Sequence, residues 1–595
     1  MNRKTTKRSR WGLLPVAILF LLALAPQVAL RFGHRPPWTG SYFSFNPDEA
    51  PYLAYINALK NGRPRRSDPF SGRDDRADAP QPESIFSIQF VPAYVIALSA
   101  RVSGVSSQTV FAILSCLVAI CAALGIYILI RLVTGDGREA AAGALIVLCC
   151  GSLRFAPFVT RFSSSGRAQY FPFLRSYVPS FAFPLFILFL ILVWVSTTTD
   201  DSRRQFVLGL SAAAIFLLLM FSYFYLWTAA IAWLCILAGF WLVLRPDKFR
   251  QGLRGIAIIV GVAVVGLFSY WRLLAHRATS TDEFQVVTKT HWPDLIRLPE
   301  LIGLVVATAI LYFARRGTFG LREQRTVFIL SLALLPLAVF NQQVLTGYSI
   351  QPIHYELYVA NYVALLAAVL MVSNTAPKAL PGPLATRAFV LAAIFAIGWG
   401  AIEITYAIRA RSELNVIRDE ARPAALRLAE MAKTRAGDPR DSIVFATNIV
   451  QADTLPADAP QPVLWAPHMR SFPGVDFAED KSRYYTQLYY TGVDAAKFES
   501  LLRETTITPS VVFGWERVNA RLASEPNPIS EGEIQQEVRK YADYIATFDH
   551  ARAASVPLEF AVASRKDNLS NLDRWYVRDE GEPVGNLLLY RLRLR

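Results

Sequence analysis

The sequence predicts an α-helical membrane protein with many transmembrane spans, followed by a soluble α/β domain. Of its 595 residues, 53% are hydrophobic and only 18% are charged, and the mean hydropathy is +0.31. An ordinary soluble protein of this length is less apolar. Apolar runs long enough to cross a bilayer core of about 30 Å recur along the chain. From about residue 410 the composition becomes that of a soluble domain.

Eleven apolar runs are predicted to span the membrane. They lie near residues 12–31, 109–130, 139–153, 177–198, 205–221, 227–244, 255–275, 298–313, 326–341, 355–373 and 388–408. The first run follows a basic head and could belong to a signal peptide, but about twenty apolar residues are long for one. We therefore expect a transmembrane domain over residues 1–409, with a retained first span and a long first outer loop at 32–108.

The segment 85–104 is a twelfth candidate, and charge decides against it. If this segment does not span, all the strongly basic connections lie on one side of the membrane and hold 19 Lys and Arg in 60 residues; they are 1–10, 131–138, 199–204, 245–254, 314–325 and 374–387. The connections on the other side hold only 15 Lys and Arg in 140 residues; they are 32–108, 154–176, 222–226, 276–297 and 342–354. Basic loops face the cytoplasm. The segment 85–104 is therefore predicted to be interfacial or re-entrant, with the N-terminus cytoplasmic and residues 410–595 outside.

Charge and cysteine content exclude two other classes of protein. The formal charge is +15, but the basic residues cluster beside apolar runs, where membrane orientation explains them better than nucleic-acid binding. All five cysteines lie in apolar runs, so they provide no disulfide framework for the soluble domain. In the turn at 221–227, Tyr223, Tyr225 and Trp227 are expected to form an aromatic belt at the outer interface.

Residues 410–595 alternate short β-rich runs with helical stretches. Strands are predicted at 442–450, 462–466, 509–515, 558–564 and 586–594, and helices near 415–434, 479–491, 494–505 and 530–547. This alternation is typical of an α/β domain, and it predicts a three-layer sheet. The strands are followed by no glycine-rich phosphate loop, so a nucleotide site is not predicted.

An acidic pair, Asp48 and Glu49, follows the first span in "FNPDEAPYLAYINALKNGRP". The spacing of Tyr52, Tyr55 and Leu59 predicts an amphipathic helix lying on the membrane. Two prolines flank the acids, so one alternative is that Asp48 or Glu49 simply caps this helix and compensates its dipole.

The order of these features resembles the GT-C glycosyltransferases. The shared features are a first span, a long outer loop opening with an acidic pair, an amphipathic helix, more than ten spans and an outer C-terminal domain. The stretch "RVSGVSSQTVFAILSCLVAICAALGIYILIRLVTGDGREAAAGALIVL" is similar to the passage of loop, span, basic turn and Ala-rich span in that family. The resemblance covers residues 10 to about 410 in architecture. It implies transfer of a sugar from a polyprenyl-phosphate donor, at the periplasmic face of a bacterial inner membrane, to an envelope glycan, lipid or protein.

In that family an acid of the first outer loop acts as general base or helps to bind a metal. The resemblance assigns this role to Asp48, with Glu49 as the alternate. A carboxylate suits the chemistry because the acceptor hydroxyl loses its proton as the sugar is transferred. Asp48 is also a candidate ligand for Mg²⁺ or Mn²⁺, which needs further ligands or phosphates.

The donor phosphate requires positive charge at the outer surface. Candidates are Arg161, Arg167 and Arg175, in an arginine-rich loop that also holds Arg154, and His354 at the start of a span. The alternatives are an exposed loop with scattered charges and a histidine whose hydrogen bonds are satisfied at the interface.

Three other functions are compatible with part of the sequence. An envelope polysaccharide polymerase or ligase of another fold would carry its large loop late in the chain, whereas here the long loop comes first. A transporter or flippase would show a repeat and mid-span charges. A non-catalytic assembly protein would tolerate replacement of Asp48.

Overall fold

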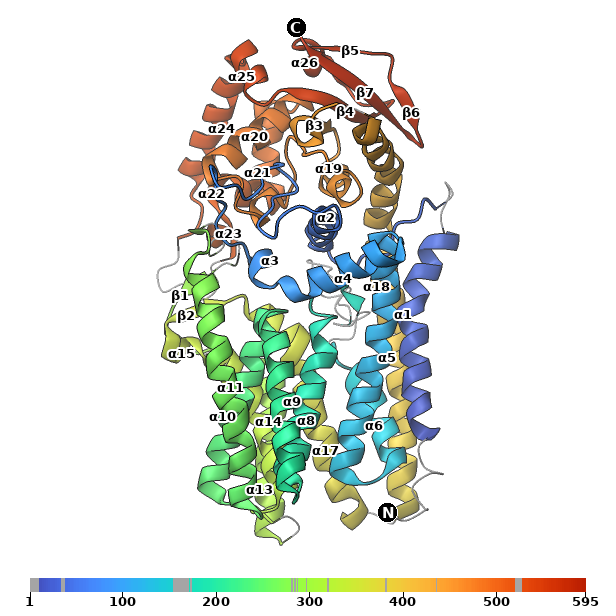
Figure 1. Ribbon diagram of the computed structural model, residues 1–595, viewed down its shortest axis with the longest axis vertical. Coiled ribbons are helices and arrows are strands. Elements are labelled where there is room, and N and C mark those ends of the chain that lie inside the picture. Colours follow the sequence, from blue (N-terminus) through green and yellow to red (C-terminus); the bar gives the residue numbers. More distant parts are fainter. Residues whose placement is uncertain are drawn as a thin grey trace.

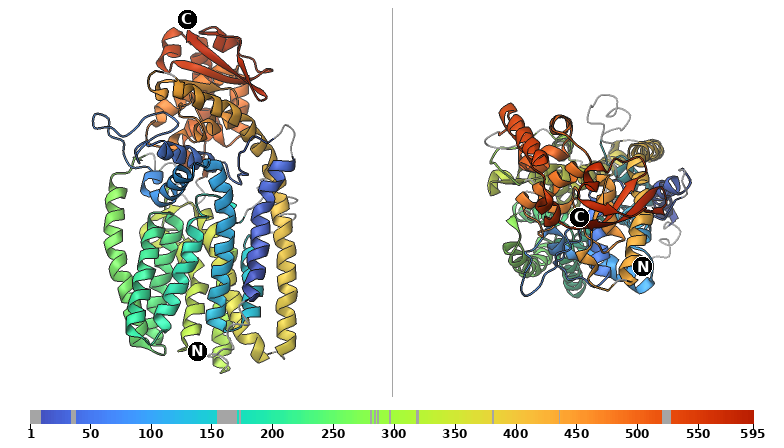
Figure 2. Two further views of the ribbon diagram at one scale, coloured as in Figure 1. Left: turned by 45° about the vertical axis from the view of Figure 1, so that its right-hand side comes forward. Right: turned by 90° about the horizontal axis from the view of Figure 1, so that it is seen from above.

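The computed structural model places a bundle of long helices below a smaller C-terminal domain (Figures 1 and 2). It describes all residues except 1–9, 34–37, 154–170, 172–173, 280–281, 283–284, 286, 296, 318–319, 380–381, 435 and 520–526. The bundle contains α1 (Leu13–Gly33), α5 (Ser107–Thr134), α6 (Gly137–Cys149), α8 (Ala182–Thr198), α9 (Ser202–Met220), α10 (Phe224–Leu244), α11 (Phe249–Ala275), α13 (Leu298–Arg315), α14 (Gln324–Asn341), α17 (Asn361–Ala379) and the first part of α18 (Gly382–Thr434).

Each of the eleven predicted spans is a helix, which confirms an α-helical polytopic membrane protein. Among the described residues, nine helices are long and apolar enough to cross a membrane. One of them runs through α16 (Pro352–Tyr355), the π-helix η3 (Glu356–Ala360) and α17. The other two predicted spans are shorter, because α6 has 13 residues and α8 has 17.

The segment 85–104 forms two short helices, α3 (Ile85–Ile88) and α4 (Phe90–Ser103), which meet at Gln89. Figure 1 shows them running across the end of the bundle instead of along it. This arrangement agrees with the prediction that the segment does not cross the membrane.

Helix α2 (Glu49–Lys60) does not lie on a membrane surface as expected. Its residues 49 to 59 are all buried, because the helix packs between α4 on one side and α19 (Ile449–Thr454) and η5 (Leu455–Ala457) on the other. The amide of Asn57 donates to the carbonyl of Pro456 at 3.1 Å. The aromatic face that suggested a lipid contact is therefore covered by protein.

The C-terminal domain is built on a mixed sheet. Its strands are β3 (Ile443–Ala446), β4 (Leu558–Ser564), β5 (Tyr576–Arg578), β6 (Glu582–Val584) and β7 (Leu587–Leu594), in the order β3-β4-β7-β5 with β6 also paired to β7. Its helices include α20 (Phe477–Tyr490), α21 (Ala495–Glu504), α22 (Ile507–Phe513), α23 (Trp515–Asn519), α24 (Glu531–Ala546), α25 (His550–Ser555) and α26 (Ser570–Asp573), with the short turns η4 (Pro439–Asp441) and η6 (Met469–Ser471). β3 and β4 are parallel, and the other pairs are antiparallel.

Two strand predictions in this domain are wrong. Of residues 509–515, the first five lie in α22, where a short apolar run packs as a buried helix, and Trp515 begins α23. Residues 462–466 make only one isolated bridge, between Val463 and Val444. Such short apolar runs do not distinguish a strand from a buried helix by pattern alone.

The two parts of the molecule are joined by more than a linker. Helix α18 continues without a break past the expected boundary at 409/410 and reaches the C-terminal domain. The long loop after α1 also pairs with that domain, for example through Arg73 and Glu479 at 2.8 Å. The same end of the bundle holds a two-stranded antiparallel sheet of β1 (Val287–Lys289) and β2 (Tyr348–Ile350) and the short helix α15 (Gln343–Thr346) (Figure 1).

Candidate active site

Asp48 and Arg175 form an ion pair where the bundle meets the C-terminal domain. Nη2 of Arg175 lies 2.7 Å from Oδ2 of Asp48. The Asp48 side chain is 41% exposed, whereas that of Arg175 is only 2% exposed. Asp48 is the N-cap residue of α2, but among the described residues its side chain makes no capping hydrogen bond. The capping alternative therefore does not account for this carboxylate.

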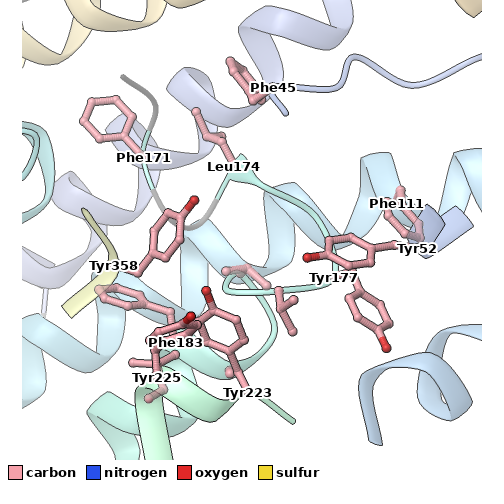
Figure 3. Close-up of a cluster of buried hydrophobic side chains, with 14 of the residues drawn as sticks. Phe45, Tyr52, Phe111, Phe171, Leu174, Tyr177, Phe183, Tyr223, Tyr225 and Tyr358 are labelled. Atoms are coloured by element: carbon pink, nitrogen blue, oxygen red, sulfur yellow. The ribbon is translucent and has the colours of Figure 1, made fainter. Parts of the chain in front are cut away.

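Arg175 is held in place by two tyrosines from distant parts of the chain. Its guanidinium donates to the hydroxyl of Tyr52, on α2, at 3.0 Å and to that of Tyr358, in η3, at 2.9 Å. It also lies over both rings, with centroid distances of 5.6 and 5.7 Å. A buried arginine needs such partners. Figure 3 shows Tyr52 and Tyr358 within one buried aromatic cluster.

His354 and Arg175 both contact the side chain of Tyr358. Its Nδ1 is 2.7 Å from the hydroxyl of Tyr223, and its ring lies 4.5 Å from that of Tyr225 and 5.4 Å from that of Tyr358. Tyr223 and Tyr225 are buried in the aromatic cluster (Figure 3), so the aromatic belt predicted from these residues and Trp227 is wrong. The π-helical turn η3 follows His354 and carries Tyr358; such turns are frequent at functional sites.

Glu49 has a different environment from Asp48, because it is fully buried. Its carboxylate accepts hydrogen bonds from the hydroxyls of Tyr42 and Ser44 and from the backbone N–H groups of Phe45, Asn46 and Ser176. Burial raises the pKa of Glu49, against the opposing effect of these donors. Since Ser176 follows Arg175 directly, the hydrogen bond from its N–H group to Glu49 connects the loop that carries Arg175 to the start of α2. The arrangement suits a residue that positions Asp48 and Arg175.

The C-terminal domain contributes a histidine to the same site. Nε2 of His468 lies 3.4 Å from Oδ1 of Asp48, and its Nδ1 lies 2.8 Å from Oδ2 of Asp453, on α19. Both side chains of this second pair are buried. Burial lowers the pKa of His468, but the carboxylates of Asp453 and Asp48 outweigh this effect and raise the pKa to about 10. His468 is therefore a cation at neutral pH.

Two cations thus act on one carboxylate. Loss of part of its hydration raises the pKa of the half-buried Asp48, but Arg175 and His468 outweigh this effect and hold the pKa well below its usual range. An aspartate with such a pKa stays ionised at every physiological pH. In this arrangement its oxygens are engaged by positive charge, which makes it a weak proton acceptor.

The metal-binding role predicted for Asp48 stays a prediction, because the described residues around it do not by themselves form a metal site. Within the described part of the chain, no group of three His, Cys, Asp or Glu side chains is placed to hold one. Asp48, the candidate ligand, has cationic side chains against both carboxylate oxygens, whereas Mg²⁺ and Mn²⁺ require oxygen ligands around them.

The structure brings together Asp48, Glu49, Arg175 and His354 from the predicted set. Arg161 and Arg167 lie outside the described residues. Sequence reasoning missed His468, Asp453, Tyr52 and Tyr358. His468 and Asp48 are 420 residues apart, and nothing in the local sequence around His468 indicates a partner near the first span.

No protein-family model matches the sequence, and no curated protein is significantly similar to it. Several solved structures of an oligosaccharyltransferase from Archaeoglobus fulgidus are similar over almost the whole chain. One, tethered to an acceptor peptide, is 11% identical, with 99% of this chain and 74% of that chain covered and a TM-score of 0.48. One in complex with an inhibitory peptide and a dolichol-phosphate is 13% identical, with 100% and 75% covered and a TM-score of 0.47. One in complex with Zn and sulfate is 13% identical, with 96% and 72% covered and a TM-score of 0.46.

Proposed function

We propose that the chain is an integral membrane glycosyltransferase. It moves a sugar from a polyprenyl-phosphate-linked donor to an envelope glycan, lipid or protein, at the periplasmic face of a bacterial inner membrane. The observation that carries the proposal is the partly exposed Asp48 carboxylate beside the buried Arg175 guanidinium, 2.7 Å apart, where the bundle meets the C-terminal domain.

The reaction needs one group to accept a proton and another to bind the leaving phosphate. The acceptor oxygen forms a bond to the anomeric carbon as the bond from that carbon to the phosphate oxygen breaks. The electron pair of the broken bond leaves with the lipid phosphate, and the acceptor proton passes to a carboxylate. Asp48 is the proposed proton acceptor, and Arg175 is the proposed phosphate contact.

His354 supports the donor side of the site. It is partly buried beside Tyr223 and Tyr225, at the start of a candidate span that enters the bundle. A lipid phosphate whose chain runs along the bundle would present its headgroup at this level. Aromatic rings with hydroxyl groups, such as those of Tyr223 and Tyr358, suit contact with a sugar through both their faces and their polar ends.

The test is a transfer assay in membranes, with a polyprenyl-phosphate-linked sugar as donor and native envelope material as acceptor. Asp48→Asn keeps the shape of the side chain but removes the proton acceptor, so turnover should fall about 10²–10⁴-fold. Asp75→Asn is the matched control, because Asp75 lies in the same loop and pairs with Arg66 at 2.6 Å, away from the site. Normal transfer by a well-expressed Asp48→Asn variant would contradict the proposal and favour an assembly protein.

A further inference from the structure

The site contains an apparent conflict between its two proposed roles. Asp48 must be free to accept a proton, and Arg175 must be free to bind phosphate, yet each is the other's partner. His468 adds a second positive charge on the opposite oxygen of the same carboxylate. The three side chains come from the first outer loop, the loop before α8 and the C-terminal domain.

Exposure distinguishes the carboxylate from its two partners. The side chains of Arg175 and His468 are 2% and 10% exposed, whereas that of Asp48 is 41% exposed. A ligand that reaches the site from outside therefore meets Asp48 before it meets the cations. The cations themselves are fixed from behind, Arg175 by the hydroxyls of Tyr52 and Tyr358 and His468 by Asp453.

A carboxylate held between two charged donors occupies the place that an oxyanion of a phosphate would take. Arginine and protonated histidine bind both groups through charge-assisted hydrogen bonds of the same geometry. A phosphate offers more acceptor oxygens than a carboxylate, so it can engage both cations at once.

We propose that Arg175 and His468 form a single phosphate site, which Asp48 fills in the unliganded protein and leaves when the donor's lipid phosphate binds. This inference rests on the proposed function and adds two parts to it. The C-terminal domain supplies His468 to the donor site, with Asp453 as its positioning residue. The proton acceptor becomes free only when a donor is present.

The inference predicts that replacing Asp48 and replacing the cations beside it have opposite effects on the affinity for a polyprenyl phosphate. His468→Gln and Arg175→Gln should each weaken binding of a polyprenyl phosphate about ten- to hundredfold, since each removes a charge-assisted contact. Asp453→Asn should also weaken this binding, because the substitution leaves His468 without its buried counter-ion. Asp48→Asn should instead strengthen binding by about tenfold or more, because it removes the internal competitor.

The experiment measures binding to the full-length protein in detergent or nanodiscs, with three probes. These are a polyprenyl phosphate, the uncharged polyprenol of the same length, and inorganic phosphate. His550→Gln is the matched control for His468, because His550 is an exposed histidine of the same domain whose Nε2 lies 3.0 Å from the carbonyl of Arg595. Thermal unfolding of each variant shows whether it is folded. The polyprenyl phosphate should stabilise Asp48→Asn more than the wild type.

Binding of the polyprenyl phosphate that is unchanged or weaker in Asp48→Asn would overturn the inference. Binding that His468→Gln leaves intact would do the same. Equal affinity for the polyprenol or for inorganic phosphate would overturn the assignment to a lipid phosphate. If the Arg175 variant is unstable, the His468 and Asp453 variants still decide the question.

The outcome separates this inference from the proposed function. If the polyprenyl phosphate binds with the expected pattern but no sugar is transferred, the glycosyltransferase proposal fails and the phosphate site stands. If sugar is transferred and Asp48→Asn binds the lipid no more tightly, the function stands and Asp48 is not a competitor.

Discussion

The two neighbouring acids at positions 48 and 49 show how burial separates the roles of similar side chains. Glu49 is fully buried and accepts two side-chain and three backbone hydrogen bonds. In Glu49→Gln, an amide N–H₂ group would face donors that now meet a carboxylate oxygen. We expect a loss of about 1–3 kcal/mol in the free energy of unfolding, seen as a lower thermal midpoint in detergent. The exposed Glu504, at the end of α21, provides the control, and Glu504→Gln should change stability by under about 0.5 kcal/mol.

His468 gives a prediction of pH dependence. Its pKa is raised from 6.5 to about 10, so its pairing with Asp453 and Asp48 contributes stability that is complete below about pH 6.5. This contribution falls as the pH rises and is lost above about pH 10. The difference in thermal midpoint between the wild type and His468→Gln should therefore shrink from pH 6 to pH 10. Arg175 also faces this cluster through Asp48 but does not titrate in this range. A difference that grows with pH would contradict the assignment.

At the scale of single residues, the sequence predicted the part of the site that lies close to a recognisable feature. Asp48 follows the first span directly, and His354 begins a later one. His468 and Asp453 are not predicted, because the sequence around each shows no motif. They come close to Asp48 only when the C-terminal domain packs against α2. The sequence also could not distinguish Asp48 from Glu49, since the difference between them is their burial.

At the scale of helices, small residues set how closely neighbours pack in the bundle. Gly303, in α13, is buried against α14, and an added Cβ would overlap the backbone oxygen of Ala333. Gly303→Ala should push the two helices apart and cost about 1–3 kcal/mol. Gly261, in α11, has open space around it, so Gly261→Ala should keep or raise the thermal midpoint. Equal midpoints for the two variants would show that α13 and α14 are not in this close contact.

The helices and strands were predictable to different degrees. The sequence locates the long apolar runs well, because an apolar run of about twenty residues has few alternatives to a membrane-spanning helix. The short run 509–515 is predicted as a strand, but most of it lies in the helix α22. The sequence predicts α2 on a membrane surface, but the helix is buried between α4 and the C-terminal domain. In both cases the apolar face was correctly identified, whereas its partner depends on tertiary packing that a local pattern does not contain.

At the scale of the whole molecule, the proposed function requires the site to face the periplasm. The C-terminal domain and the connection between α13 and α14 lie at opposite ends of the bundle (Figure 1). Lys497, in α21, and Arg322, in that connection, are exposed. The connection belongs to the basic side of the molecule, which is expected to be cytoplasmic. The domain that carries His468 should then lie outside.

Cysteine labelling tests this orientation in intact cells. A membrane-impermeant maleimide should label Lys497→Cys and should label Arg322→Cys only after the membrane is permeabilised. The parent chain is the background control, because its five cysteines lie in apolar segments. Labelling of Arg322→Cys but not of Lys497→Cys in intact cells would place Asp48, Arg175 and His468 on the cytoplasmic side. A periplasmic acceptor could not then reach Asp48, and both the proposed transfer and the expected orientation of the molecule would have to be rejected.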